Sequence, residues 1–184
     1  MTAVARSVLS LVYRLRGFTC TSLLVHVPVA EPAIAVLGGH PEGDVPAHVT
    51  VAYPFTLTAM GARASAELAQ LFAEHPAFDV EFHAVRRFDD DAYLAPREPL
   101  PFAALATAVQ NRSPGNPLYG GAFGTYTPHV TIGPVHRLTS AGLQAVERLL
   151  PLHAQVREVE LWGLRGSHWV RVRGFDLAAP PPAN

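Results

Sequence analysis

The sequence contains no lysine, only one cysteine, and no apolar run long enough to span a membrane. Its 14 basic side chains are therefore all arginines, and with 15 acidic residues they give a formal net charge of −1. This balance gives the chain no general attraction to nucleic acid or to anionic membranes, so any affinity for RNA must be local. Phosphate contacts would have to come from arginine, histidine, hydroxyl groups or backbone amides.

The single cysteine, Cys20, excludes an internal disulfide and a zinc site built from cysteines. Three arginines interrupt the first twenty residues, which therefore make a poor secretory signal. Apolar residues with helical spacing between positions 8 and 15 indicate that residues 1–20 form an amphipathic helix or a disordered extension. We expect a cytoplasmic protein with no membrane association.

The length predicts one domain, over 21–177, followed by a proline-rich disordered tail over 178–184. Periodicity predicts helices mixed with strands, which is an α+β fold class. Strands are predicted at 21–29, 47–55, 78–87, 92–96, 125–133, 155–162 and 168–177, and helices at 32–37, 61–74 and 101–111, with another that begins after Thr139 or Ser140.

The tripeptide His-Val-Thr occurs twice, at 48–50 and at 129–131, each time inside an apolar, β-branched run. In a strand, residues two apart face the same side, so each copy presents an imidazole and a hydroxyl on one face. The next residue on that face is small, Ala52 or Gly133, and would leave room for a ligand. One copy alone is more typical of an ordinary core strand, but two copies in matching contexts favour a functional pair.

These residues, His48, Thr50, His129 and Thr131, resemble the paired motif of the 2H phosphoesterase superfamily, with histidines 81 positions apart (129 − 48). That superfamily includes the 2′-5′ RNA ligase-like proteins and cyclic nucleotide phosphodiesterases. The resemblance extends to 45–55 and to 86–96. One position departs, since Pro134 stands where the RNA ligase-like branch often carries an arginine. The resemblance implies two pseudo-twofold-related lobes of antiparallel-rich sheet with flanking helices and an active-site cleft between them.

For this chain the resemblance implies a phosphodiesterase that opens the 2′,3′-cyclic phosphate of a nucleotide or an RNA end. One histidine, His48 or His129, would act as general base and the other as general acid, since the ordinary imidazole pKa of about 6.5 suits both roles. Thr50 and Thr131 would donate hydrogen bonds to the phosphoryl oxygens. No cofactor and no metal are expected, because the other histidines lack the spacing of a zinc site.

Aromatic residues close to the motifs could stack a nucleobase, and an arginine could contact phosphate. The candidates for substrate binding are Tyr53, Phe55, Phe88, Tyr126 and Arg86. Three alternatives stay open: 2′-5′ RNA ligation, a module that binds a nucleotide or RNA end without turnover, and a purely structural or interaction protein. We expect a monomer, because no pattern indicates an interface.

Overall fold

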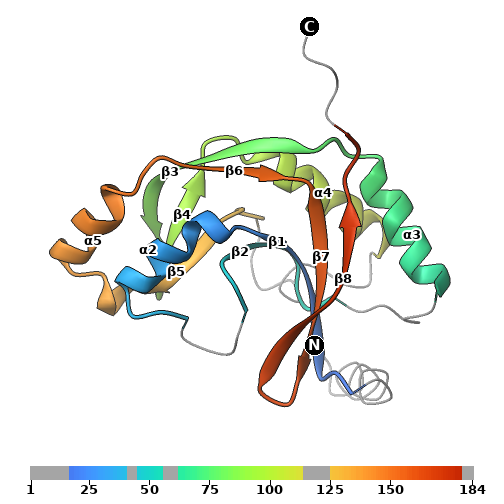
Figure 1. The fold of residues 1–184 in the computed structure, drawn as a ribbon, viewed down its shortest axis with the longest axis horizontal. Coiled ribbons are helices and arrows are strands. Elements are labelled where there is room, and N and C mark those ends of the chain that lie inside the picture. Colours follow the sequence, from blue (N-terminus) through green and yellow to red (C-terminus); the bar gives the residue numbers. More distant parts are fainter. Residues whose placement is uncertain (1–16, 41–44, 56–61, 114–124, 180–184) are drawn as a thin grey trace, which may run out of the picture.

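The computed structural model describes residues 17–40, 45–55, 62–113 and 125–179. These residues form two four-stranded antiparallel sheets, in the orders β2-β1-β7-β8 and β5-β4-β3-β6 (Figure 1). Together with the helices, the two sheets confirm the predicted α+β fold with two lobes. The strands are β1 (Cys20–His26), β2 (His48–Ala52), β3 (Phe78–Arg87), β4 (Asp91–Pro96), β5 (Val130–Pro134), β6 (Leu152–Val156), β7 (Glu158–Arg165) and β8 (His168–Asp176).

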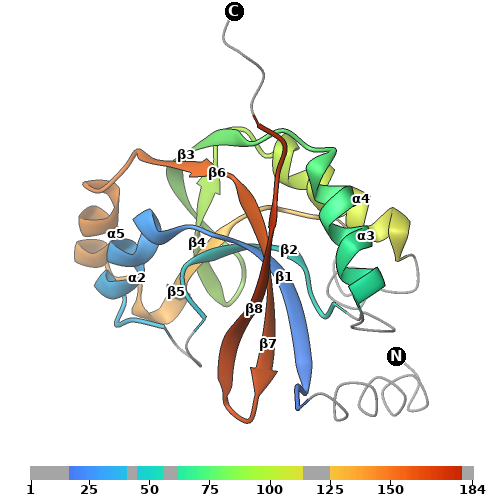
Figure 2. The same cartoon turned by 45° about the vertical axis from the view of Figure 1, so that its right-hand side comes forward.

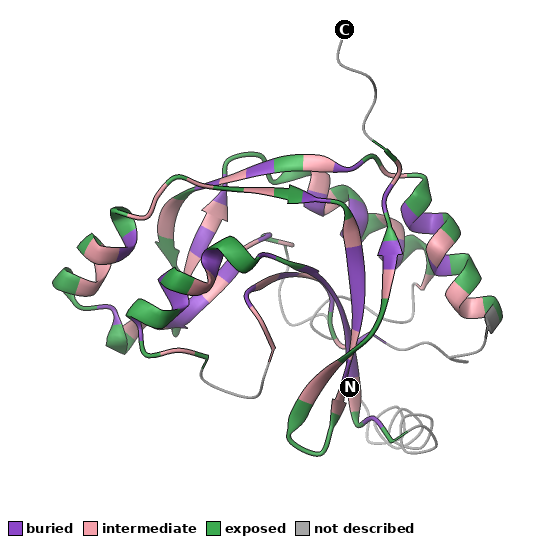
Figure 3. Ribbon diagram, in the orientation of Figure 1, coloured by how far each residue is buried: buried purple, intermediate pink, exposed green. Residues whose placement is uncertain are grey.

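The helices flank the sheets at both ends of the molecule (Figure 1). Helix α3 (Ala62–Ala73) packs on β8 and α4 (Leu100–Arg112) packs on β2, whereas α2 (Glu31–Val36) contacts both β5 and α5 (Ser140–Glu147). The longer helices alternate between buried and exposed residues, as expected for amphipathic helices on a core (Figure 3). Within the described ranges, no helix is both long and apolar enough to cross a membrane.

The two motif strands, β2 and β5, are edge strands of different sheets and contact one another near the centre of the molecule (Figure 2). Alternation along each strand decides which side chains enter the core. Val49 and Val51 of β2 are fully buried, as are Val130 and Ile132 of β5. The histidine and threonine side chains of the motifs lie on the opposite face and are only partly buried. The prediction that each motif strand has an apolar face in the core and an opposite face with the histidine and the threonine is therefore confirmed.

The single strand predicted at 155–162 is wrong, because the chain forms β6 and β7 in different sheets with only Arg157 between them. Val159, Glu160 and Leu161 are all buried, so β7, a central strand between β1 and β8, is covered on both faces and shows no alternation there. Alternation of buried residues therefore does not mark Arg157 as the point where the chain changes sheets.

Described residues on both sides of 21–177 also take part in the fold. Phe18 is buried, and the Thr19 N–H donates a hydrogen bond to the Leu164 carbonyl at 2.8 Å. At the other end, Ala178 forms a parallel bridge with Pro76. The expected extension before residue 17 and the tail after residue 179 lie outside the described residues.

Gly133 does not leave the room for a ligand that its small size suggested. The side chain of Leu37 occupies that space, and a Cβ at Gly133 would lie 3.2 Å from the Leu37 Cβ. Gly133 also has a φ of 142°, a backbone conformation that residues other than glycine rarely adopt. The glycine therefore lets β5 approach the end of α2.

Candidate active site

A pocket of about 280 Å³ contains His48, Thr50 and Thr131, which are three of the four motif residues. Thr50 comes from β2 and Thr131 from β5, so the pocket joins the edges of the two sheets. Strand β1 contributes Ser22 and the hairpin of β7 and β8 contributes Trp169. Elements far apart in the sequence therefore converge on the two threonine hydroxyls.

The two histidines are held by the same local hydrogen bond. The Nδ1 atom of His48 lies 2.7 Å from the Pro46 carbonyl oxygen, and Nδ1 of His129 lies 2.7 Å from the Thr127 carbonyl oxygen. A carbonyl oxygen can only accept, so each Nδ1 carries the proton and donates it. In the neutral ring, Nε2 then holds a lone pair and remains available for proton transfer.

His129 does not line the pocket but lies close beside it. Its ring makes edge contacts with Phe88 and Tyr93, with centroids 4.9 and 5.3 Å away. A charge on His129 lowers the pKa of His48, so the two imidazoles interact. Ahead of β5, the Tyr126 hydroxyl donates to the Thr50 carbonyl at 2.8 Å and ties the two motif segments together.

The pKa values of both histidines lie below the ordinary value, and burial is the main cause for each. For His48, charges on His129, His40 and His26 lower the pKa further, while the hydrogen bond to Pro46 opposes these effects. For His129, the hydrogen bond to Thr127 and the negative charge of Asp91 both oppose the effect of burial. Burial and neighbouring charges therefore both lower the pKa of His48, whereas for His129 the neighbouring charge of Asp91 opposes the effect of burial.

The five residues predicted to bind substrate lie in different parts of the structure. Tyr53 lines the pocket, because β2 ends at Ala52 and its regular alternation does not extend to Tyr53. Phe55 is 1% exposed and belongs to the core, so its side chain does not line the pocket. The side chain of Tyr126 ties the strands together as described above.

The other two candidates, Phe88 and Arg86, lie on the side of His129. Phe88 is exposed and stacks on Tyr93, with ring centroids 4.2 Å apart. Arg86 is opposite Tyr93, and Tyr93 is opposite Thr131, so the three lie in one row across the sheet. Two strand-to-strand steps separate them, so the Cα atoms of Arg86 and Thr131 are about 10 Å apart.

Sequence reasoning missed several residues of the site. Tyr93 contacts His129, and Trp169 faces Tyr53 with ring centroids 6.3 Å apart at an angle of 57°. His40 lines the pocket and lies 2.8 Å from a carboxylate oxygen of Glu31. No local pattern marks these residues, because strand order and helix packing bring them to the motifs.

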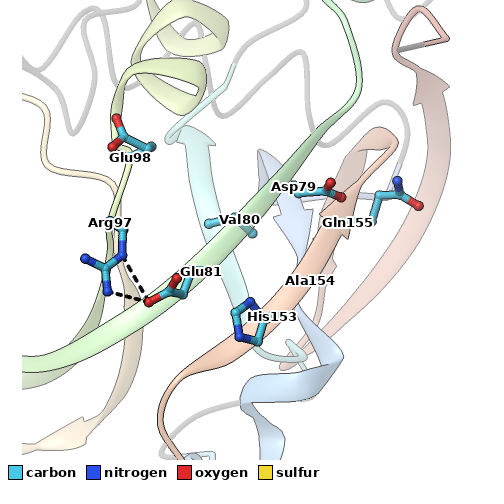
Figure 4. Close-up of a pocket in the computed structure, with 8 residues that line it drawn as sticks. All are labelled: Asp79, Val80, Glu81, Arg97, Glu98, His153, Ala154 and Gln155. Carbon is cyan, nitrogen blue, oxygen red and sulfur yellow. Dashed lines mark hydrogen bonds and ion pairs between the residues drawn. The ribbon is translucent and has the colours of Figure 1, made fainter. Parts of the chain in front are cut away.

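A larger hollow of about 570 Å³ lies elsewhere, on the outer face of β3 and β6 (Figure 4). Its Glu81 is paired with Arg97 at 2.6 Å and lies opposite His153 on the neighbouring strand. The hollow contains none of the four motif residues, and most of its charged side chains are exposed, as is typical of the solvated face of a sheet. We therefore assign the site to the smaller pocket.

Across the described ranges, no group of three or more His, Cys, Asp or Glu side chains could hold a metal ion. Arg137, the arginine nearest in sequence to Pro134, places its guanidinium beside Gly38 and is not part of the pocket wall. Among the described residues of the pocket wall, the side chains able to carry a positive charge are those of His40 and His48.

Solved structures with the same fold include a protein described as a phosphoesterase, with 15% identity and a TM-score of 0.57, covering 86% of this chain and 98% of the other. Another is LigT from E. coli in complex with 3′-AMP, with 17% identity and a TM-score of 0.57, covering 86% and 97%. A third is TT0787 from Thermus thermophilus, with 14% identity and a TM-score of 0.53, covering 87% and 98%. At these identities the likeness shows the fold.

No curated protein matches the chain. The model of the 2′-5′ RNA ligase superfamily, however, matches residues 25–168, a stretch that contains both motifs. This match covers most of the sequence and agrees with the resemblance to the 2H phosphoesterases that the paired tripeptides indicated. The chain belongs to the 2′-5′ RNA ligase superfamily.

Proposed function

We propose that the protein is a metal-independent phosphodiesterase that hydrolyses the 2′,3′-cyclic phosphate of a nucleotide or of an RNA end. The proposal rests on one observation, that equivalent hydrogen bonds hold the rings of His48 and His129. Each ring donates Nδ1–H to the carbonyl two residues before it and leaves Nε2 available beside a pocket with two threonines. Such a pair supplies both proton transfers that hydrolysis requires.

We assign the role of base to His48 and the role of acid to His129. His48 is more deeply placed and faces three other histidines, so its neutral form is favoured. His129 has the carboxylate of Asp91 nearby, and this negative charge supports the protonated form. A base must be neutral and an acid must be protonated at the start of the reaction, so the two environments match these roles.

In the proposed step, Nε2 of His48 removes a proton from a water molecule, whose oxygen attacks the phosphorus. The bond from phosphorus to one ribose oxygen breaks, and Nε2–H of His129 protonates that oxygen. The product is a ribose phosphomonoester with a free hydroxyl, and the proton balance is restored by exchange with solvent. Thr50 and Thr131 donate hydrogen bonds to the non-bridging oxygens, where negative charge increases in the transition state.

The size of the pocket supports a small reacting group. Its volume of about 280 Å³ is near the lower end for small-molecule sites, so it suits a cyclic phosphate with part of its sugar. Tyr53 and Trp169 are placed to contact a base attached to that sugar. Burial raises the pKa of Tyr53 to about 12, so its hydroxyl stays uncharged near phosphate. Structures of E. coli LigT with 3′-AMP and NADP+ agree with a nucleotide ligand.

The test is hydrolysis of the four nucleoside 2′,3′-cyclic phosphates, with and without EDTA, by the wild type and by His48→Ala and His129→Ala. We expect turnover that resists EDTA and is lost in both variants. Tight binding without product would instead indicate a binding module, and joining of RNA ends through a 2′-5′ linkage would indicate a ligase. Activity that EDTA abolishes would refute the metal-independent mechanism.

A further inference from the structure

The peptide unit between Pro46 and Ala47 is hydrogen-bonded on both sides. Its carbonyl oxygen accepts the Nδ1–H of His48 at 2.7 Å, and its N–H donates to Oε1 of Glu31, also at 2.7 Å. Both groups belong to one planar, conjugated amide. A single peptide unit therefore connects the carboxylate of Glu31, at the start of α2, to the imidazole of His48, at the start of β2.

The second motif lacks this connection. The Thr127 carbonyl accepts Nδ1–H of His129 in the same way, but the next residue is Pro128. Proline has no N–H, so the peptide unit that holds His129 cannot be contacted by an acceptor. Each histidine thus donates its Nδ1–H to a backbone carbonyl. Only the peptide unit that accepts from His48 has an N–H that can donate to a carboxylate.

Glu31 carries a negative charge at neutral pH. Burial raises its pKa, but the hydrogen bond from Ala47, the contact with His40 and the charges of His40 and His26 together hold the pKa below the ordinary value. Hydrogen bonds to ionised acceptors are stronger than neutral ones, and bonds in a chain polarise one another. The charge on Glu31 therefore makes the Pro46 oxygen a better acceptor for Nδ1–H.

We propose that Glu31 is a positioning residue that acts on His48 through peptide unit 46–47, and that His40 weakens this action by sharing the same carboxylate. The effect is to fix the ring of His48 with its proton on Nδ1 and to strengthen Nε2 as a base. Carboxylates that contact a metal-bound histidine directly have a comparable orienting effect. The inference rests on the proposed function only in taking His48 as the base.

The test is an NMR titration of the His48 ring, which needs no substrate. Glu31→Gln keeps an oxygen for the Ala47 N–H and removes the charge, so the pKa of His48 should fall. His40→Asn frees the carboxylate and removes a nearby positive charge, so the pKa of His48 should rise. The remaining groups that face these residues, His26 and His129, are unchanged in both variants. The charge on His40 also lowers the pKa of His48 directly, so the opposite shifts test the effect of charge, and the route through the peptide unit needs a further variant.

Ala47→Pro removes the N–H without altering Glu31 and gives the first motif the local sequence of the second. This variant should lower the pKa of His48, and adding Glu31→Gln to it should then have little further effect. The non-additivity identifies the peptide unit as the route. If Ala47→Pro does not fold, Glu31→Asp, which keeps the charge but shortens its reach, should lower the pKa of His48 as Glu31→Gln does.

Glu81→Gln is the matched control, because Glu81 is also a paired glutamate but lies on the outer face of β3. It should leave the titration of His48 unchanged. Where substrate is turned over, Glu31→Gln should reduce kcat about tenfold, the lower end of the effect of removing an orienting partner. An unchanged His48 titration in Glu31→Gln, or shifts of equal sign in Glu31→Gln and His40→Asn, would overturn the proposal. Absence of turnover would count against the proposed function alone.

Discussion

The threonine hydroxyls offer the most direct test of how the pocket stabilises charge. Thr50 and Thr131 approach the same pocket from different sheets. Replacing either with valine preserves its shape and its preference for a strand while it removes the hydroxyl. A hydrogen bond to a charged group contributes about 1.5–3 kcal/mol, so each variant should lose about 10- to 160-fold in kcat. If the hydroxyls act independently on one phosphoryl group, the double variant should lose about 10²-fold or more.

The assay is steady-state hydrolysis of a nucleoside 2′,3′-cyclic phosphate, with circular dichroism and thermal melting to verify folding. The loss should fall mainly on kcat, because negative charge on the phosphoryl oxygens increases in the transition state. Thr107→Val, at an exposed position of α4, is the control and should behave like the wild type. Native-like melting combined with losses below about threefold in both single variants would refute the role given to the hydroxyls.

The remaining predictions concern pH, substrate binding and stability. The pH profile of kcat/KM should be bell-shaped, because one histidine must be neutral while the other is protonated. Its optimum should lie below about 6.5, since His48 and His129 both have lowered pKa values. An optimum above about pH 7.5 would contradict this prediction. The free energy of unfolding should fall on acidification below about 6.5, because the unfolded chain then binds more protons at these histidines than the native protein, and urea titrations of His48→Gln should show a weaker dependence. Trp169→Ala should raise KM with little change in kcat, an effect that should vanish with a substrate lacking a base. Ile132→Val should destabilise the protein by about 0.5–1.5 kcal/mol in urea denaturation, because the removed methylene leaves a cavity in a fully buried position.

Local patterns in the sequence were sufficient to predict the faces of the motif strands. The alternation around Val49 and Val130 depends only on neighbouring residues, as does the helix start at Thr139, whose hydroxyl accepts the Gly142 N–H. Interactions that depend on strand order could not be predicted in this way. Tyr93 reaches His129 because β4 lies between β3 and β5.

Helix packing explains another part of the site that the sequence did not reveal. Glu31 begins α2, a short helix that the sequence did predict, but its partner Ala47 lies sixteen residues later and no local pattern connects the two. Leu37 fills the space beside Gly133 for the same reason, because α2 packs on β5. Such contacts follow from tertiary structure, which no single window of sequence contains.

The direct passage from β6 to β7 bears on how the site is kept ready for reaction. Movement of two lobes about a hinge needs a few residues whose dihedral angles can change freely. Here one residue, Arg157, links strands that are paired in different sheets, and its own carbonyl accepts the Leu177 N–H at 2.8 Å. The lobes are therefore expected to form a stiff frame in which the separation of the two imidazoles is fixed before substrate arrives. The entropy of bringing acid and base together is then lost during folding rather than in each catalytic cycle.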